Sequence, residues 1–175
     1  MTTRLIRLDD APALSAALRD NREFLAPWEP VRDESYFTEA GQHEVITSLL
    51  RGFAEGTTLP HVILDGRQVV GRITLTGIVR GPFQSANLGY WVVAAANGRG
   101  LATAAVREIA RIAFADLKLH RIEAGTLLHN AASQKVLARN GFICFGTAPK
   151  YLKIAGEWQD HAMFQLLAPD PDDPA

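Results

Sequence analysis

The sequence is poor in cysteine, and it has neither a long apolar run nor an excess of charge of one sign. A single Cys excludes an internal disulfide and a paired CxxC metal or redox motif, so we expect a reducing compartment, the cytoplasm. The longest apolar stretch, residues 88–96, is far shorter than the ~20 residues that cross a bilayer, and the N-terminus does not have the pattern of a signal peptide. We therefore expect no membrane association.

The charges are nearly balanced, with 18 Lys+Arg against 19 Asp+Glu and a net charge of −1. General nucleic-acid binding needs a basic surface, so we expect no direct contact with nucleic acid. The five His residues show no metal-ligand spacing, and we expect no metal site. Cys144 lies in the apolar run 142–145, which predicts a buried position.

The length of 175 residues and a hydrophobic content of 47% predict one globular domain, residues 1–168. Residues 169–175 contain three Asp and three Pro, which is typical of a disordered acidic tail. Strands are expected at 4–8, 61–64, 69–75, 88–93, 121–128, 142–145 and 158–167. Helices are expected from residue 9 to about 19, from 35 or 38 to 56, and at 100–116 and 131–139, with loops at 21–33 and 77–85. This order predicts an α/β fold with a mixed sheet.

The stretch 97–103, Asn-Gly-Arg-Gly-Leu-Ala-Thr, lies between a predicted strand and a predicted helix. The first N–H groups of a helix have no internal partner, and bare glycine backbone at Gly98 and Gly100 lets an anion approach them. Arg99 adds a cation and Thr103 a hydroxyl, so the stretch predicts a pyrophosphate-binding loop. The alternative is that the two glycines only make a tight turn.

This loop resembles the Gln/Arg-x-x-Gly-x-Gly/Ala loop of the GNAT acetyltransferase superfamily, from which it departs at Asn97. Residues 130–133 with Asn-Gly-Phe at 140–142, the strand 88–92 and the strand 120–124 resemble further elements of that family. The resemblance implies the GNAT fold, a mostly antiparallel sheet of six to seven strands in which parallel strands 4 and 5 splay apart. It implies direct acetyl transfer from acetyl-CoA, a co-substrate, to an amine, with no covalent acyl-enzyme. It also implies cofactor contacts at Trp91, Val92, Val93, Asn97, Gly98, Arg99, Gly100, Leu101, Ala102, Thr103, Asn130 and Ser133.

Residues 21–30 and 156–161 resemble the Rim-type subgroup, the ribosomal-protein N-terminal alanine acetyltransferases. That resemblance implies that the acceptor is the α-amine of a peptide or protein N-terminus, contacted by Phe24, Trp28, Glu29 and Tyr36. A small-molecule amine (amino acid, polyamine or antibiotic) and a non-catalytic acyl-CoA-binding domain remain as alternatives. The sequence leaves both a monomer and a homodimer open.

Three residues are candidates for catalysis. Glu123, on the strand that borders the gap in this fold, is the leading general base, and a structural ion pair is its alternative role. The position at which the family often has an acidic Tyr is Leu137 here. Ser133 is therefore the first candidate to protonate the thiolate, with helix capping as the alternative. Tyr90 is the second candidate, unless it is only part of the core.

Overall fold

The structure, a computed structural model, describes residues 2–169. Of the tail expected at 169–175, residues 170–175 therefore lie outside the described residues. None of the described helices is long and apolar enough to cross a membrane.

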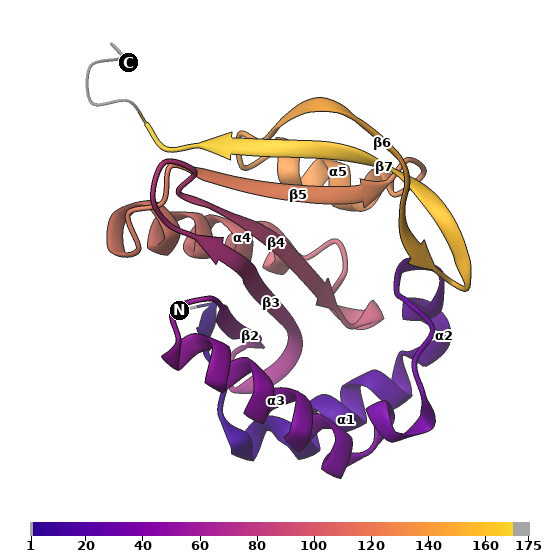
Figure 1. Ribbon diagram of the computed structural model, residues 1–175. Helices are drawn as coiled ribbons and strands as arrows, with labels where there is room; N and C mark the ends of the chain where they lie inside the picture. The colour runs from indigo at the N-terminus through magenta and orange to yellow at the C-terminus, as the bar shows by residue number, and fades with distance from the viewer. Residues whose placement is uncertain (1, 170–175) are drawn as a thin grey trace.

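A seven-stranded sheet, with strand order β1-β2-β3-β4-β5-β7-β6, runs through the whole molecule (Figure 1). All neighbouring strands are antiparallel except β4 and β5, which confirms the predicted mixed, mostly antiparallel sheet. The strands are β1 Thr3–Leu5, β2 Leu59–Asp65, β3 Gln68–Val79, β4 Ser85–Val92, β5 Arg121–Leu127, β6 Ile143–Ile154 and β7 Glu157–Leu167.

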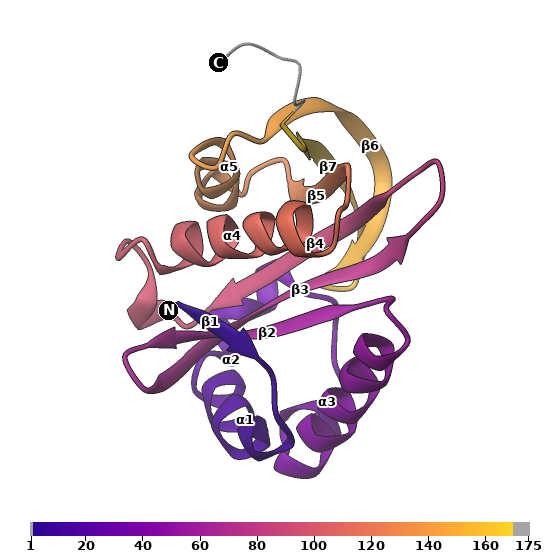
Figure 2. The same cartoon turned by 90° about the vertical axis from the view of Figure 1, so that its left-hand side faces the viewer.

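Helices cover both faces of this sheet (Figure 2). They are α1 Ala11–Asp20, α2 Arg22–Leu25, α3 Glu39–Ala54, α4 Leu101–Arg111 and α5 Ala131–Ala138. On one face, α4 packs on the larger core, where Ile73, Ile109 and Ile122 are fully buried. On the other face, α1 and α3 pack on a second core around Leu14 and Ile46.

The β4–β5 pairing is short, and this shortness creates the site. Only three register pairs join the strands, and the last is Asn87 with Glu123. Beyond this pair β4 stays on β3, while β5 stays on β7 as far as Leu127. Because each strand follows a different neighbour and sheets twist, the two strands part and leave unpaired backbone on facing edges.

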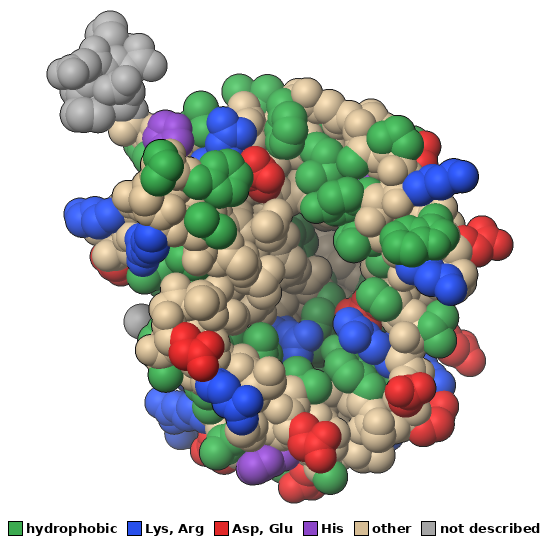
Figure 3. Space-filling view, in the orientation of Figure 1, with side chains coloured by type: hydrophobic (Ala, Val, Ile, Leu, Met, Phe, Trp, Pro, Cys, Tyr) green, Lys and Arg blue, Asp and Glu red, His purple; other side chains and the backbone are tan. Residues whose placement is uncertain are grey.

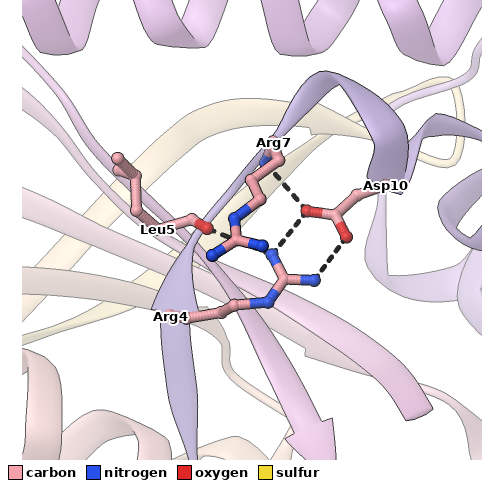
Figure 4. Close-up of polar contacts among 4 residues, drawn as sticks. All are labelled: Arg4, Leu5, Arg7 and Asp10. Carbon is pink, nitrogen blue, oxygen red and sulfur yellow. Dashed lines mark hydrogen bonds and ion pairs between the residues drawn. The ribbon is translucent and has the colours of Figure 1, made fainter. Parts of the chain in front are cut away.

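The first strand is shorter than predicted, because an ion pair turns the chain at its end (Figure 4). The strand ends at Leu5, and Leu8 lies in a 3₁₀ turn before α1. Arg4 donates through Nη1 and Nη2 to the two carboxylate oxygens of Asp10 at 2.8 and 2.6 Å, and the backbone N–H of Arg7 donates to the same carboxylate. Asp10 is buried, so this pair of hydrogen bonds with Arg4 fixes the connection between β1 and α1.

Three other segments differ from prediction, and the first is the loop expected at 77–85, because β3 extends to Val79 and β4 begins at Ser85. Residues 21–33 are not only a loop, since α2 and a 3₁₀ turn, Ala26–Trp28, lie within them. Strand β6 is much longer than 142–145, because it pairs with β7 across two register breaks. Most of its side chains face solvent, so its sequence carries no alternation of buried and exposed residues. The prediction that Cys144 is buried is wrong for the same reason.

Candidate active site

Two adjacent cavities lie beside the parted strands. The larger cavity, of about 380 Å³, lies over β3 and the end of β5, and the smaller one, of about 310 Å³, lies at the N-termini of α4 and α5. Figure 3 shows the hollow at the centre of the molecule, with Lys or Arg atoms on its floor. Both cavities are lined by Trp28, Tyr90, Trp91, Asn130 and Ser133, so these residues lie where the two meet.

The N-terminus of α4 has the geometry of an anion-binding loop. Gly98 and Gly100 have φ of 72° and 78°, the left-handed region in which a side chain is strained. A Cβ atom on either glycine would meet nothing within 4 Å. No side chain caps α4, whose first N–H groups therefore remain available to a ligand. The residues present fit the pyrophosphate of coenzyme A.

Arg99, the cation that the sequence suggested for this loop, is paired in the structure. Its guanidinium forms an ion pair with Asp65 at the tip of the β2–β3 hairpin, and Nη2 donates to Asp65 Oδ1 at 3.2 Å. Since Asp65 offsets part of the charge of Arg99, the backbone N–H groups at the start of α4 provide much of the positive field.

The open edge of β4 is formed by Tyr90 and Val92. The N–H of Val93 donates to the carbonyl of Val70 at 2.8 Å, and the carbonyl of Trp91 faces Gly71 on β3. Because alternate residues of a strand direct their backbone groups to opposite edges, Tyr90 and Val92 face the gap. Five of the predicted cofactor contacts do not line the smaller cavity: Val93, Arg99, Gly100, Leu101 and Thr103.

At the N-terminus of α5 a hydroxyl pair faces both cavities. The side chain of Asn130 caps the helix by accepting the N–H of Ser133 at 3.0 Å. Ser133 is therefore not the cap, and its Oγ lies 2.8 Å from the hydroxyl of Tyr90. Burial, opposed by the Ser133 hydrogen bond, raises the pKa of Tyr90 to about 12, so this phenol is neutral at physiological pH.

Glu123 lies outside both cavities. It occupies the last paired register of β5, before the strands part, and its carboxylate lies 3.4 Å from Nη1 of Arg121. The same nitrogen donates to Gln165 Oε1 at 2.6 Å. The structure therefore places Glu123 in the ion pair that was the alternative to its role as a base.

The carboxylate at the larger cavity is that of Glu29, in the segment before α3. Glu29 lines this cavity, and its backbone carbonyl accepts the N–H of Ala155 at 3.0 Å, which holds the segment against the β6–β7 turn. Desolvation raises the pKa of Glu29, while Arg32 and Arg72 oppose that shift. Trp28 stacks on His129 with ring centroids 5.5 Å apart and walls the hollow.

The other predicted acceptor residues are more distant from this carboxylate. Phe24 lines the smaller cavity instead. Tyr36 does not line the larger cavity, but its hydroxyl accepts a long hydrogen bond of 3.5 Å from Nη2 of Arg72, which does. Tyr36 can therefore act on this cavity only through Arg72.

Among the titratable side chains that line the larger cavity, sequence reasoning missed Arg72 and His161. The signal for Arg72 was present, because a lone Arg interrupts the apolar strand pattern 69–75. His161 lies on β7, with Nδ1 3.0 Å from the carbonyl of Gln159. No group of His, Cys, Asp or Glu in residues 2–169 has the arrangement of a metal site.

Comparison with known proteins agrees with this geometry. A family model described as an acetyltransferase (GNAT) domain matches residues 1–143. The chain is 34% identical over 172 residues to the [ribosomal protein uS5]-alanine N-acetyltransferase of Escherichia coli (strain K12), covering 97% of this chain and 89% of that protein.

Two solved structures are similar over nearly the whole chain. The ribosomal-protein-S5-alanine acetyltransferase of Vibrio fischeri superposes with a TM-score of 0.91 at 33% identity, covering 98% of this chain and 94% of the other. RimJ of Mycobacterium smegmatis, solved in complex with CoA-disulfide, gives a TM-score of 0.92 at 33% identity, covering 95% and 81%.

Proposed function

Because the chain belongs to the GNAT acetyltransferase family, we propose that it moves the acetyl group of acetyl-CoA directly to the α-amine of a peptide or protein N-terminus. The observation that carries the proposal is the gap between β4 and β5, with one cavity on each side and the Tyr90–Ser133 hydroxyl pair between them. Two substrates that enter from opposite sides would meet there without a covalent enzyme intermediate.

The smaller cavity suits the cofactor. Coenzyme A, when bound, supplies the thioester that is the acetyl donor. The N–H groups at the start of α4 would hold its pyrophosphate, and the open edge at Tyr90 and Val92 would pair with its amides as an added strand does. The cap uses Oδ1 of Asn130, so Nδ2 remains as a donor to the same ligand.

The Tyr90–Ser133 pair would stabilise the departing thiolate by hydrogen bonding. One hydroxyl donates to the other, and the remaining proton, which Tyr90 can direct to the backbone carbonyl of Ser133 at 3.3 Å, would turn toward the sulfur. Burial raises the pKa of Tyr90 to about 12, which disfavours complete transfer of its proton to the thiolate. Tyr90 therefore donates a hydrogen bond and keeps its proton. The proton that the sulfur finally gains balances the one that the attacking amine loses.

An α-amine is a suitable acceptor on chemical grounds. Its pKa of about 7.7–8.0 leaves a useful neutral fraction near pH 7.4, whereas a Lys side chain at about 10.4 is almost wholly protonated. The Escherichia coli relative named above is an alanine N-acetyltransferase of a ribosomal protein, which supports the same acceptor class here.

The test is an assay of thiol release from acetyl-CoA with two matched peptides. One has a free N-terminal Ala and no Lys, and the other has a blocked N-terminus and one Lys. We expect acceptor-dependent thiol release with the first peptide alone, and mass spectrometry should place the acetyl group on its α-amine. Acetylation of the Lys peptide alone, or tight CoA binding without thiol release across peptides and small amines, would overturn the proposal.

A further inference from the structure

The larger cavity contains two oppositely charged groups that do not pair with each other. Glu29 comes from the segment before α3 and Arg72 from β3, and both line the cavity. Among residues 2–169 the ion pairs do not include either side chain. Facing charges in a partly buried space normally close on each other, so their separation leaves room for a ligand between them.

Arg72 has an unsatisfied donor. Its Nη1 is fully buried and has no hydrogen-bond partner among the described residues, and Nη2 makes only the 3.5 Å contact with Tyr36. An unsatisfied buried donor costs about 1–3 kcal/mol, and more when it is charged. Arg72 lines the cavity, so a ligand oxygen that contacts its guanidinium would satisfy Nη1 once a small shift of the side chain uncovers that atom.

Glu29 is the matching acceptor on the other side. Its carboxylate is desolvated, and its backbone is fixed by the hydrogen bond from Ala155. It would gain from a ligand group that donates hydrogen bonds, such as an amine or an ammonium. The ligand that suits the cavity therefore carries a nitrogen donor and an oxygen acceptor close together.

We propose that Glu29 and Arg72 form a two-point site for an α-aminoacyl group, with the amine of the acceptor on Glu29 and the adjacent carbonyl oxygen on Arg72. In such a group only Cα and the carbonyl carbon separate the two polar atoms, which lie about 3 Å apart by standard bond lengths. A Lys side chain or a simple alkylamine carries no oxygen at this distance. Selectivity for α-amines then comes from Arg72, in addition to the lower pKa of the amine.

This inference rests on the proposed function and makes it more specific. Tyr36 is a positioning residue in it, because its hydroxyl contacts Arg72 Nη2 and does not line the cavity itself. A peptide N-terminus and a free amino acid share the α-aminoacyl chemistry, so the experiment must separate these two sources.

The test compares alaninamide with butan-2-amine, which has nearly the same shape around the amine but lacks the carbonyl. Rates are expressed per neutral amine, because the two amines differ in pKa. Arg72→Met should lower kcat/KM for alaninamide by about 10- to 100-fold, the equivalent of one charged hydrogen bond. It should lower kcat/KM for butan-2-amine much less, only through the loss of a positive charge that favours ionised Glu29, and it should leave the Kd for CoA unchanged. Glu29→Gln should lower kcat/KM for both amines, because both present the same nitrogen.

The controls keep the outcomes distinct. Arg107→Met makes the same substitution on the exposed surface of α4 and should change neither amine. If Arg72→Met does not fold, Arg72→Lys keeps the charge and should give a smaller loss confined to alaninamide. Failure of the wild type to use butan-2-amine at all would support the two-point site. Equal kcat/KM for the two amines in the wild type, or an equal loss for both in Arg72→Met, would overturn it.

A second comparison separates this inference from the proposed function. An Ala-initiated tetrapeptide should be a better acceptor than free alanine if protein N-termini are the substrates. Preference for free alanine would overturn the proposed acceptor while leaving the two-point site intact. Preference for a polyamine would overturn the two-point site.

Discussion

Substitution of Gly100 by Ala tests the anion-binding loop, because the structure separates its effect on folding from its effect on the cofactor. Gly100 is the N-cap of α4 with φ of 78°, and a Cβ atom there would point into open space. A non-glycine residue in this conformation costs about 1–2 kcal/mol. For a chain of this size the melting temperature should fall by about 2–4 °C for each kcal/mol.

The chain offers a matched control in Gly81, in the β3–β4 turn. Its φ is 73°, and a Cβ atom there also meets nothing within 4 Å. Gly81→Ala should therefore cost the same stability as Gly100→Ala. Only Gly100→Ala should weaken CoA binding, by about 10- to 100-fold, if its methyl group removes one charge-assisted contact between the pyrophosphate and a backbone N–H.

Calorimetric titration with CoA and thermal unfolding with and without CoA give both quantities. A ligand that binds only the folded state stabilises it by RT ln(1 + [L]/Kd), so the two measurements must agree. If Gly100→Ala melts like Gly81→Ala but binds CoA as tightly as the wild type, the N-terminus of α4 is not the pyrophosphate site.

Three further outcomes follow from other contacts. Tyr90→Phe and Ser133→Ala should each lower kcat by about 10²–10³-fold. The double variant should be no slower than either single variant, because the two hydroxyls act as one donor. Pre-steady-state rates in which the two losses add would refute this. Glu29→Gln should increase stability to urea at pH 7–8, because burial raises the folded pKa of Glu29 and its ionised form is costly above that pKa. The gain should vanish at pH values well below 4.5, the ordinary pKa of a Glu side chain, because Glu29 is then protonated in both the folded and the unfolded state. A gain in stability that persists at such pH values would contradict the raised pKa of Glu29. Asp10→Asn should lower stability by about 1.5–3 kcal/mol by removing the charge that Arg4 contacts, with CoA affinity unchanged, and thermal unfolding measures this.

The parts of the site that sequence predicted are those built from local chain. The loop around Gly98 and Gly100 could be recognised because glycines at a strand–helix junction act on the next few N–H groups. Asn130 was placed at the start of α5 by the same kind of short-range pattern, although the structure gives it, and not Ser133, the capping role.

The location of Glu123 outside both cavities is the feature that local pattern could not give. The spacing that favoured Glu123 fixes the strand face on which a side chain lies, but not where β5 leaves β4. That point depends on the packing of β5 against β7 and of β4 against β3, which are contacts between distant segments. Glu29 and Arg72 are 43 positions apart in the sequence, since 72 − 29 = 43, and only the closed sheet brings both to one cavity.

The pairing of Arg99 with Asp65 changes how the near-neutral charge of the chain should be understood. With Arg99 occupied by Asp65, the field at the start of α4 comes mainly from backbone N–H groups, which the left-handed Gly98 and Gly100 leave uncovered. Oriented N–H groups carry partial positive charge whatever the net charge of the protein. A chain with a net charge of −1 can therefore bind a polyanionic cofactor at one helix terminus. The rest of its surface need not bind other polyanions, such as nucleic acids, because their binding requires an extended basic face on the protein.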